Sequence, residues 1–134
     1  MINLEIKDKY ELQALHKALM ESKFNPYPLE PVVQSSPMVA RVMNLVVDEL
    51  EKINWVTDAE RKLRKLEFKN GWAEWRTNPP EDKIVSIFKR NIAYILDLEI
   101  ESDEKLYEYL SILVAPYKLD KSECTRLLDL AKSA

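Results

Sequence analysis

Glycine is almost absent from this chain of 134 residues, since Gly71 is the single example. A phosphate-binding Walker loop needs two glycines, a dinucleotide-binding fingerprint needs three, and the nucleophile elbow of hydrolases needs two. An EF-hand calcium loop needs its glycine within an acidic run, whereas Gly71 lies between Asn70 and Trp72. The sequence therefore excludes all four kinds of site.

Histidine and cysteine are equally rare, with one of each. This scarcity rules out most zinc sites and any disulfide within the chain. Position 13 is Gln, so His16 does not complete a Glu-x-x-His motif, and we expect a structural role for it. A helix N-terminus can lower a thiol pKa, but Cys124 has no histidine near it in the sequence, and we expect a small thiol that is buried or partly exposed. We therefore predict no catalytic, cofactor-binding or metal-binding residue.

Long apolar runs are also missing. The longest ones, such as residues 92–96, fall far short of the roughly 20 residues that cross a bilayer. Residues 2–7 alternate between apolar and polar side chains, so the start of the chain does not look like a signal peptide. With one unpaired cysteine as well, we expect a cytoplasmic protein that does not associate with membranes.

Helix signals, in contrast, recur along the chain. Capping side chains precede five segments with apolar residues at helical spacing, and these caps are Asp8, Ser36, Thr57, Ser102 and Asp120. The Asn78-Pro79-Pro80 sequence opens a sixth, which we predict to be one long helix to about residue 98. Its apolar positions share one buried face, with Phe88 and Ile92 at the centre of the core, and they are Ile84, Val85, Phe88, Ile92, Ile95 and Leu96. The sequence thus predicts a mainly α fold, a compact single-domain bundle of about six helices over residues 1–134.

One connection, residues 24–36, is rich in proline. Pro26, Pro28 and Pro31 restrict its backbone to extended or turned conformations and remove three hydrogen-bond donors. A connection of this length is usually a packed strap or a binding loop. We predict a strap, although Pro28-x-x-Pro31 also fits the pattern of a polyproline II ligand.

Residues 66–76 allow two structures. Asn70-Gly71 is a strong hairpin signal, and a hairpin would give residues 2–6, which alternate like a strand, a partner. However, that register pairs Glu67 with Glu74, and Trp72 and Trp75 also fit a helical stripe. We predict helix, with an α+β fold as the alternative, in which residues 2–6 and a hairpin at 66–76 form a small sheet.

Charge is unevenly distributed. Residues 60–90 carry nine basic and five acidic side chains, whereas residues 91–134 carry five basic and nine acidic ones. The basic segment also holds two tryptophans, and its candidate partner-binding residues are Arg61, Lys62, Arg64, Lys65, Lys69, Trp72, Trp75 and Arg76. Basic and aromatic side chains together suit nucleic acid or an acidic protein, although a solvated helix face has the same composition. We predict that at least one of the two tryptophans, Trp72 before Trp75, is substantially exposed and belongs to the partner-binding surface.

The densest acidic stretch comprises Glu99, Glu101, Asp103 and Glu104. Carboxylates this close together could hold a hard cation, but they have no defined ligand spacing. Acids are also favoured where a helix begins, as we expect at Ser102. We therefore interpret this stretch as helix capping and solvation.

No constellation in the sequence pairs a nucleophile with a base. With the segregated charge, this predicts a small protein–protein interaction or regulatory protein of bacterial type, an adaptor or an inhibitor, whose partner is an unknown protein. A nucleic-acid-associated protein that uses residues 60–90 is the alternative, although the low sequence pI of 5.3 weighs against it. An enzyme that uses carboxylates, tyrosine and arginine is a third hypothesis. The sequence does not specify an oligomeric state.

Overall fold

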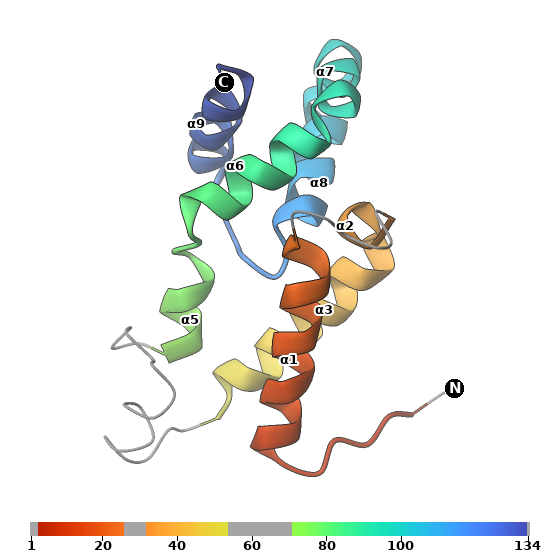
Figure 1. The fold of residues 1–134 in the computed structure, drawn as a ribbon, viewed down its shortest axis with the longest axis vertical. Coiled ribbons are helices and arrows are strands. Elements are labelled where there is room, and N and C mark those ends of the chain that lie inside the picture. Colours follow the sequence, from red (N-terminus) through yellow and green to blue (C-terminus); the bar gives the residue numbers. More distant parts are fainter. Residues whose placement is uncertain (1–2, 26–31, 54–70, 134) are drawn as a thin grey trace.

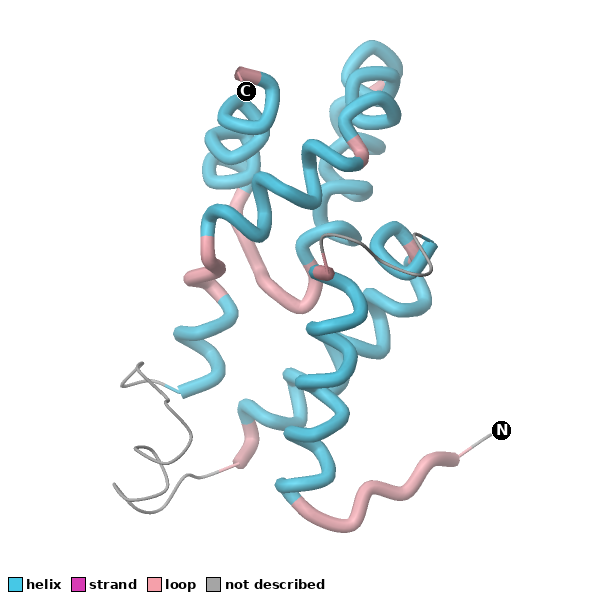
Figure 2. The backbone as a smooth tube through the Cα atoms, viewed as in Figure 1, coloured by secondary structure: helices cyan, strands magenta, loops and turns pink. Residues whose placement is uncertain are grey.

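The computed structural model describes residues 3–25, 32–53 and 71–133. These residues form eight helices: α1 (Lys9–Phe24), α2 (Val32–Ser35), α3 (Pro37–Glu51), α5 (Gly71–Arg76), α6 (Glu81–Arg90), α7 (Ile92–Glu101), α8 (Asp103–Val114) and α9 (Lys121–Lys132). Helices α1 and α3 lie side by side at one end of the molecule, and α7 and α9 reach the other end (Figure 1). The described residues contain helices and connections but no strand, so the predicted mainly α fold is confirmed (Figure 2).

Side-chain caps begin four helices at the residues that the sequence predicts. Asp8 Oδ1 accepts hydrogen bonds from the backbone N–H groups of Tyr10 and Glu11, both at 2.9 Å. The side chains of Ser36, Ser102 and Asp120 accept from backbone N–H groups in the first turns of α3, α8 and α9. Each cap satisfies an amide that has no partner within its own helix. The capping box at Thr57 and residues 26–31 of the strap lie outside the described residues.

The alternative small sheet finds no support. Residues 3–7 form no strand, and the second half of the possible hairpin, from Trp72 to Trp75, belongs to α5. Gly71 opens this helix with a φ of 62°, a left-handed conformation that glycine adopts without strain. The first half of the hairpin, residues 66–70, lies outside the described residues.

The predicted long helix over residues 79–98 is divided at Asn91, where α6 ends and α7 begins. The Asn91 side-chain amide donates to the carbonyl of Ile87 at 2.8 Å, so it takes the acceptor that a continuous helix would offer to the Asn91 backbone. The backbone N–H of Asn91 bonds instead to Phe88, and the Asn91 carbonyl accepts from Ile95, which starts α7. One asparagine therefore ends one helix and begins the next.

The main core gathers apolar side chains from both ends of the molecule. Ile84, Ile87 and Phe88 of α6 are fully buried against residues of α8 and α9, and α1, α3 and α7 add further side chains. Ile92, which we expected in the centre of this core, is only half-buried, whereas Ile95 is fully buried. A smaller cluster joins Leu12 of α1 to Val46 and Leu50 of α3.

Lys23 is completely buried at the end of α1, which the sequence did not indicate. Its Nζ donates to the carbonyls of Ile112 at 2.6 Å and Ala115 at 2.7 Å. The Ile112 carbonyl has no partner within α8 because the residue four positions on is Pro116, which lacks an N–H. Burial lowers the pKa of Lys23 to about 7. This amine therefore joins the end of α1 to the end of α8.

Replacement of Phe88 by alanine should lower the free energy of unfolding by about 3–5 kcal/mol, because it removes a fully buried ring from the main core. Ile100→Ala is the control, since Ile100 is exposed and should change stability by less than about 1 kcal/mol. Urea unfolding of both variants measures the difference. A loss under about 1 kcal/mol for Phe88→Ala would contradict this description of the core.

Candidate functional site

The predicted basic and aromatic segment is described only in its last part. Trp72, Trp75 and Arg76 belong to α5, which packs against α3. The other five candidate residues, Arg61, Lys62, Arg64, Lys65 and Lys69, lie outside the described residues. The geometry of α5 therefore indicates how this part of the segment is arranged.

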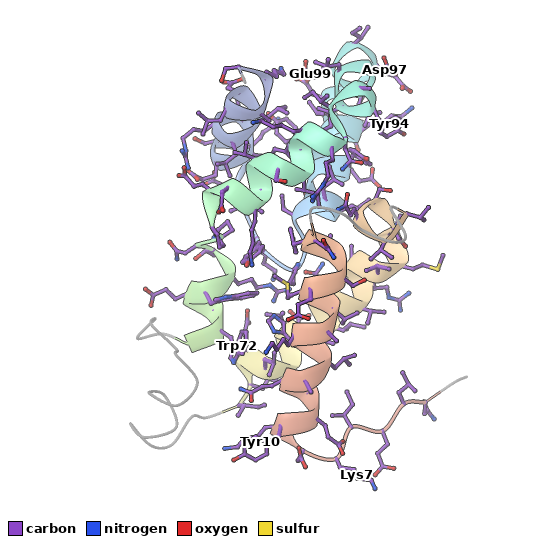
Figure 3. All side chains as sticks on the ribbon, in the orientation of Figure 1. Lys7, Tyr10, Trp72, Tyr94, Asp97 and Glu99 are labelled. Atoms are coloured by element: carbon purple, nitrogen blue, oxygen red, sulfur yellow. The ribbon has the colours of Figure 1, made fainter. Side chains whose placement is uncertain are left out.

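Both tryptophans of α5 turn toward the body of the protein. The ring of His16, on α1, lies 4.8 Å from the Trp72 ring and 5.0 Å from the Trp75 ring, measured between centroids. Trp75 also lies 4.6 Å from the ring of Tyr117. Figure 3 places Trp72 between α5 and α1. Both indoles are half-buried, so our expectation that Trp72 is substantially exposed is not met.

The polar atoms around this aromatic cluster are poorly satisfied. His16 Nε2, Trp72 Nε1 and the Gln13 side-chain oxygen are buried and have no hydrogen-bond partner among the described residues. Burial lowers the pKa of His16 to about 4, so the imidazole is neutral at pH 7. A neutral ring packed between two indoles fits the structural role that we expected for His16.

The free energy of unfolding should fall when the pH is lowered from about 6.5 to about 4. The unfolded chain binds a proton at His16 near pH 6.5, whereas the folded protein resists protonation down to about pH 4. We expect His16 to contribute about 2–3 kcal/mol to this loss of stability. Urea unfolding at several pH values should show a shallower pH dependence for His16→Phe, which keeps an aromatic ring without a titratable group. Equal dependence in both proteins would contradict the assignment.

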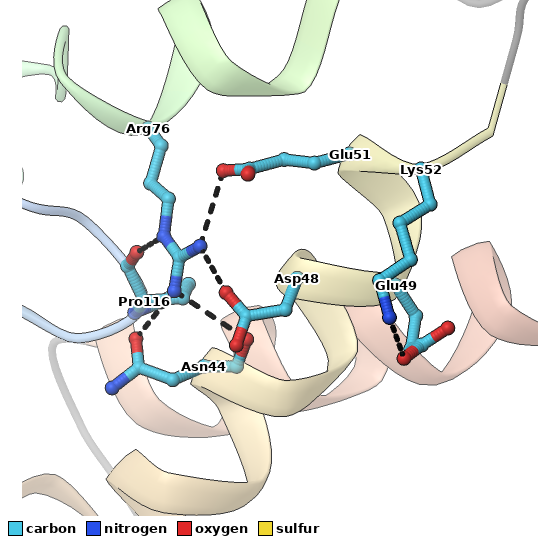
Figure 4. Close-up of polar contacts among 7 residues, drawn as sticks. All are labelled: Asn44, Asp48, Glu49, Glu51, Lys52, Arg76 and Pro116. Carbon is cyan, nitrogen blue, oxygen red and sulfur yellow. Dashed lines mark hydrogen bonds and ion pairs between the residues drawn. The ribbon is translucent and has the colours of Figure 1, made fainter.

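Arg76, at the end of α5, is buried and fully hydrogen-bonded (Figure 4). Its Nη1 donates to Asp48 at 2.6 Å and to Glu51 at 3.1 Å. Its Nη2 donates to the side-chain oxygen of Asn44 at 2.9 Å, and its Nε donates to the carbonyl of Pro116 at 2.7 Å. The bond to Arg76 is also the main reason why the pKa of Asp48 lies below its usual value.

The Arg76 guanidinium thus binds α3 and the connection between α8 and α9, and it offers no accessible charge to a partner. This differs from our prediction, which placed Arg76 on the binding surface. The pattern of basic residues in the sequence cannot tell a surface arginine from a buried one, because the acceptors come from segments that are distant along the chain.

Arg76→Met should lower the free energy of unfolding by about 2–4 kcal/mol, since it leaves the Pro116 carbonyl and Asp48 without their partner. Arg76→Lys should recover only part of this loss, because one ammonium cannot reach acceptors on both sides of a planar guanidinium. Arg126→Met is a suitable control, since Arg126 makes its ion pairs at the surface. Thermal or urea unfolding measures the stability of each variant. If Arg76→Met were as stable as the control, the proposed contribution of Arg76 to stability would be contradicted.

A second surface, which lies on α7, is not among the sites that the sequence predicts. Seven of the ten residues of α7 are apolar, yet only Ile95 and Leu98 are buried. Leu96, which we expected on the buried face, is 43% exposed, and Ile100 is 88% exposed. Residues 92–96 are among the longest apolar runs in the sequence. Such a run on one short helix indicates an exposed apolar surface, because a single buried face cannot accommodate all of these side chains.

The exposed apolar residues of α7 form a line. Ala93, Leu96 and Ile100 are spaced by three and four residues, which places them on one face of the helix, and all three are exposed. We call these three residues the α7 stripe. Tyr94, which is 54% exposed, lies beside it. Figure 3 shows Tyr94 and Asp97 pointing outward from α7.

Acidic side chains are concentrated in α7 and at the start of α8. Residues 91–104 include five acidic residues and no basic one. Two of the five are paired, Glu99 with Lys132 and Glu101 with Lys105. Asp97, Asp103 and Glu104 have no ion pair among the described residues. On α7 itself, the apolar stripe is therefore bordered by acidic residues, of which Asp97 has no ion pair among the described residues.

A groove lies between α7 and α8, on the flank of α7 that carries Tyr94 and Leu98. It has a volume of about 550 Å³ and is lined by Ser35, Pro37, Tyr94, Leu98, Lys105, Glu108, Tyr109 and Ile112. The rings of Tyr94 and Tyr109 meet edge to face with their centroids 4.8 Å apart. Tyr109 in turn donates a hydrogen bond to Asn91, so the break between α6 and α7 also positions this pair.

Among the described residues, the side chains with chemical reactivity are not gathered into a site. Cys124 is buried, and its burial raises the pKa of the thiol to about 11, so of the two predicted states the structure shows the buried one. In the part of the chain that the structure describes, no group of three or more His, Cys, Asp or Glu side chains is placed to hold a metal ion. None of the described helices combines the length and the apolar character that a membrane span requires.

No known protein family, curated protein or solved structure matches the chain, so its function is inferred from the site itself.

Proposed function

We propose that this protein is a protein–protein interaction module, an adaptor or regulator, and that the α7 stripe is its binding surface. The observation that carries the proposal is the exposure of Leu96 and Ile100 on a helix that is mostly apolar. Scattered apolar residues on a protein surface are ordinary, but three in a line on one helix form a continuous contact face. The unpaired cysteine is in keeping with a role in the cytoplasm.

The apolar side chains at this surface supply part of the free energy that specific binding requires. Complete burial of a fully exposed leucine or isoleucine side chain yields about 1.5–3 kcal/mol. Because Leu96 is 43% and Ile100 88% exposed, the two together can supply about 2–4 kcal/mol of the roughly 8 kcal/mol of a micromolar complex. Tyr94 adds a half-exposed aromatic side chain, a type that is enriched among residues that dominate binding energy.

The nucleic-acid alternative draws less support from the described residues. Arg76 is buried, and the two tryptophans of α5 turn toward His16. The exposed apolar surface on α7, moreover, has an acidic border that would repel phosphate. An enzymatic role draws less support still, because burial keeps His16 neutral and the Cys124 thiol protonated at pH 7.

A comparison of two double variants tests the proposal. Leu96→Gln with Ile100→Gln removes the apolar side chains of the stripe without adding charge. Leu130→Gln with Leu4→Gln is the matched control, because Leu130 is 43% exposed and Leu4 is 90% exposed, close to the values of 43% and 88% in the stripe. Each protein is used as bait in native lysate with and without nuclease treatment, and retained proteins are quantified by mass spectrometry.

We expect the wild type and the control to retain the same defined protein and the stripe variant to retain at least tenfold less of it. Equal retention by both variants would contradict the proposal. Capture that disappears from all three baits after nuclease treatment would favour the nucleic-acid alternative instead. Circular dichroism confirms that the variants are folded.

A further inference from the structure

We propose that the partner bound by the α7 stripe is a basic amphipathic helix. This inference rests on the proposed function and specifies the chemistry of the partner. It follows from two features of the surface: the shape of the stripe and the charge around it.

The shape of the stripe suits a helix. Ala93, Leu96 and Ile100 follow one another along about 10 Å of the axis of α7, at 1.5 Å per residue. A helix packs well against a second helix, because the apolar side chains of the second fit between those of the first at the same spacing. Ile95 and Leu98 hold the opposite side of α7 in the core, so the stripe remains open to a partner.

The charge around the stripe selects a basic partner. Asp97 points outward beside the stripe, and Glu101, Asp103 and Glu104 follow it in the sequence (Figure 3). A second copy of this chain, docked by the same helix, would bring two sets of these carboxylates together, which the charge repulsion opposes. Anionic lipid and nucleic acid are disfavoured for the same reason. Lysine or arginine at the edges of an apolar helix face would meet carboxylates on this border.

Three synthetic peptides of about 18 residues, long enough to form a helix on contact, test the proposal. The first is an amphipathic helix of leucine and lysine, the second has glutamate in place of lysine, and the third has the composition of the first in scrambled order. Each carries a fluorescent label, and binding to the full chain is measured by fluorescence anisotropy at low and at moderate salt concentration.

We expect the leucine–lysine peptide to bind at least tenfold more tightly than either of the others, and less tightly as salt is added. Leu96→Gln with Ile100→Gln should weaken this binding at least tenfold, and the control with Leu4→Gln and Leu130→Gln should leave it unchanged. Asp97→Lys with Glu101→Lys should reverse the preference toward the leucine–glutamate peptide. This reversal separates recognition at α7 from general attraction to an acidic protein.

Equal binding of the scrambled peptide, or full binding by the stripe variant, would overturn the inference, because binding would then depend on charge alone. If no peptide binds although the stripe variant loses its partner in the lysate, the proposed function stands and the helical, basic nature of the partner is wrong. If the stripe variant keeps its partner in the lysate as well, both proposals fail.

Discussion

The arrangement of the helices around α5 depends on the hydrogen bonds that the Arg76 guanidinium donates. A buried arginine needs an acceptor for each of its five N–H groups, and these acceptors come from Asn44, Asp48 and Glu51 on α3 and from Pro116 beyond α8. The Arg76 carbonyl also accepts a hydrogen bond from the backbone of Lys118 at 2.9 Å. The side of α5 that faces α1 is fixed as a result, and with it the inward position of Trp72 and Trp75.

A second buried basic side chain acts on the same region. Lys23 donates hydrogen bonds to the carbonyls of Ile112 and Ala115, close in the sequence to Pro116, whose carbonyl accepts from Arg76. Two basic side chains from distant parts of the sequence therefore hold the end of α8 and the connection that follows it. Since α7 packs against α8, these two contacts also help to set the orientation of the proposed binding surface.

The break at Asn91 relates the core to this surface. If α6 continued through Asn91, the residues that follow would extend the axis of α6. Instead Asn91 caps one helix and starts another, and α7 packs along α8 with Ile95 and Leu98 inward. Leu96 and Ile100 then face outward. Their burial by a partner would contribute favourable free energy to binding, because folding does not bury them completely. Asn91 also accepts a hydrogen bond from Tyr109, which forms part of the wall of the groove between α7 and α8.

The local sequence predicts the mainly α fold and the starts of α1, α3, α8 and α9, because a cap and its amide lie within three residues of each other. Helical spacing also predicts the burial of Phe88 and Ile95, although the same spacing placed Ile92 and Leu96 on the buried face. Tertiary packing is the reason that α6 ends at Asn91, that Lys23 and Arg76 are buried, and that Leu96 is exposed. A cation can be buried only where other segments bring acceptors to it, and α7 is more apolar than one buried face requires. Which of its residues remain outside therefore depends on how α8 packs against it.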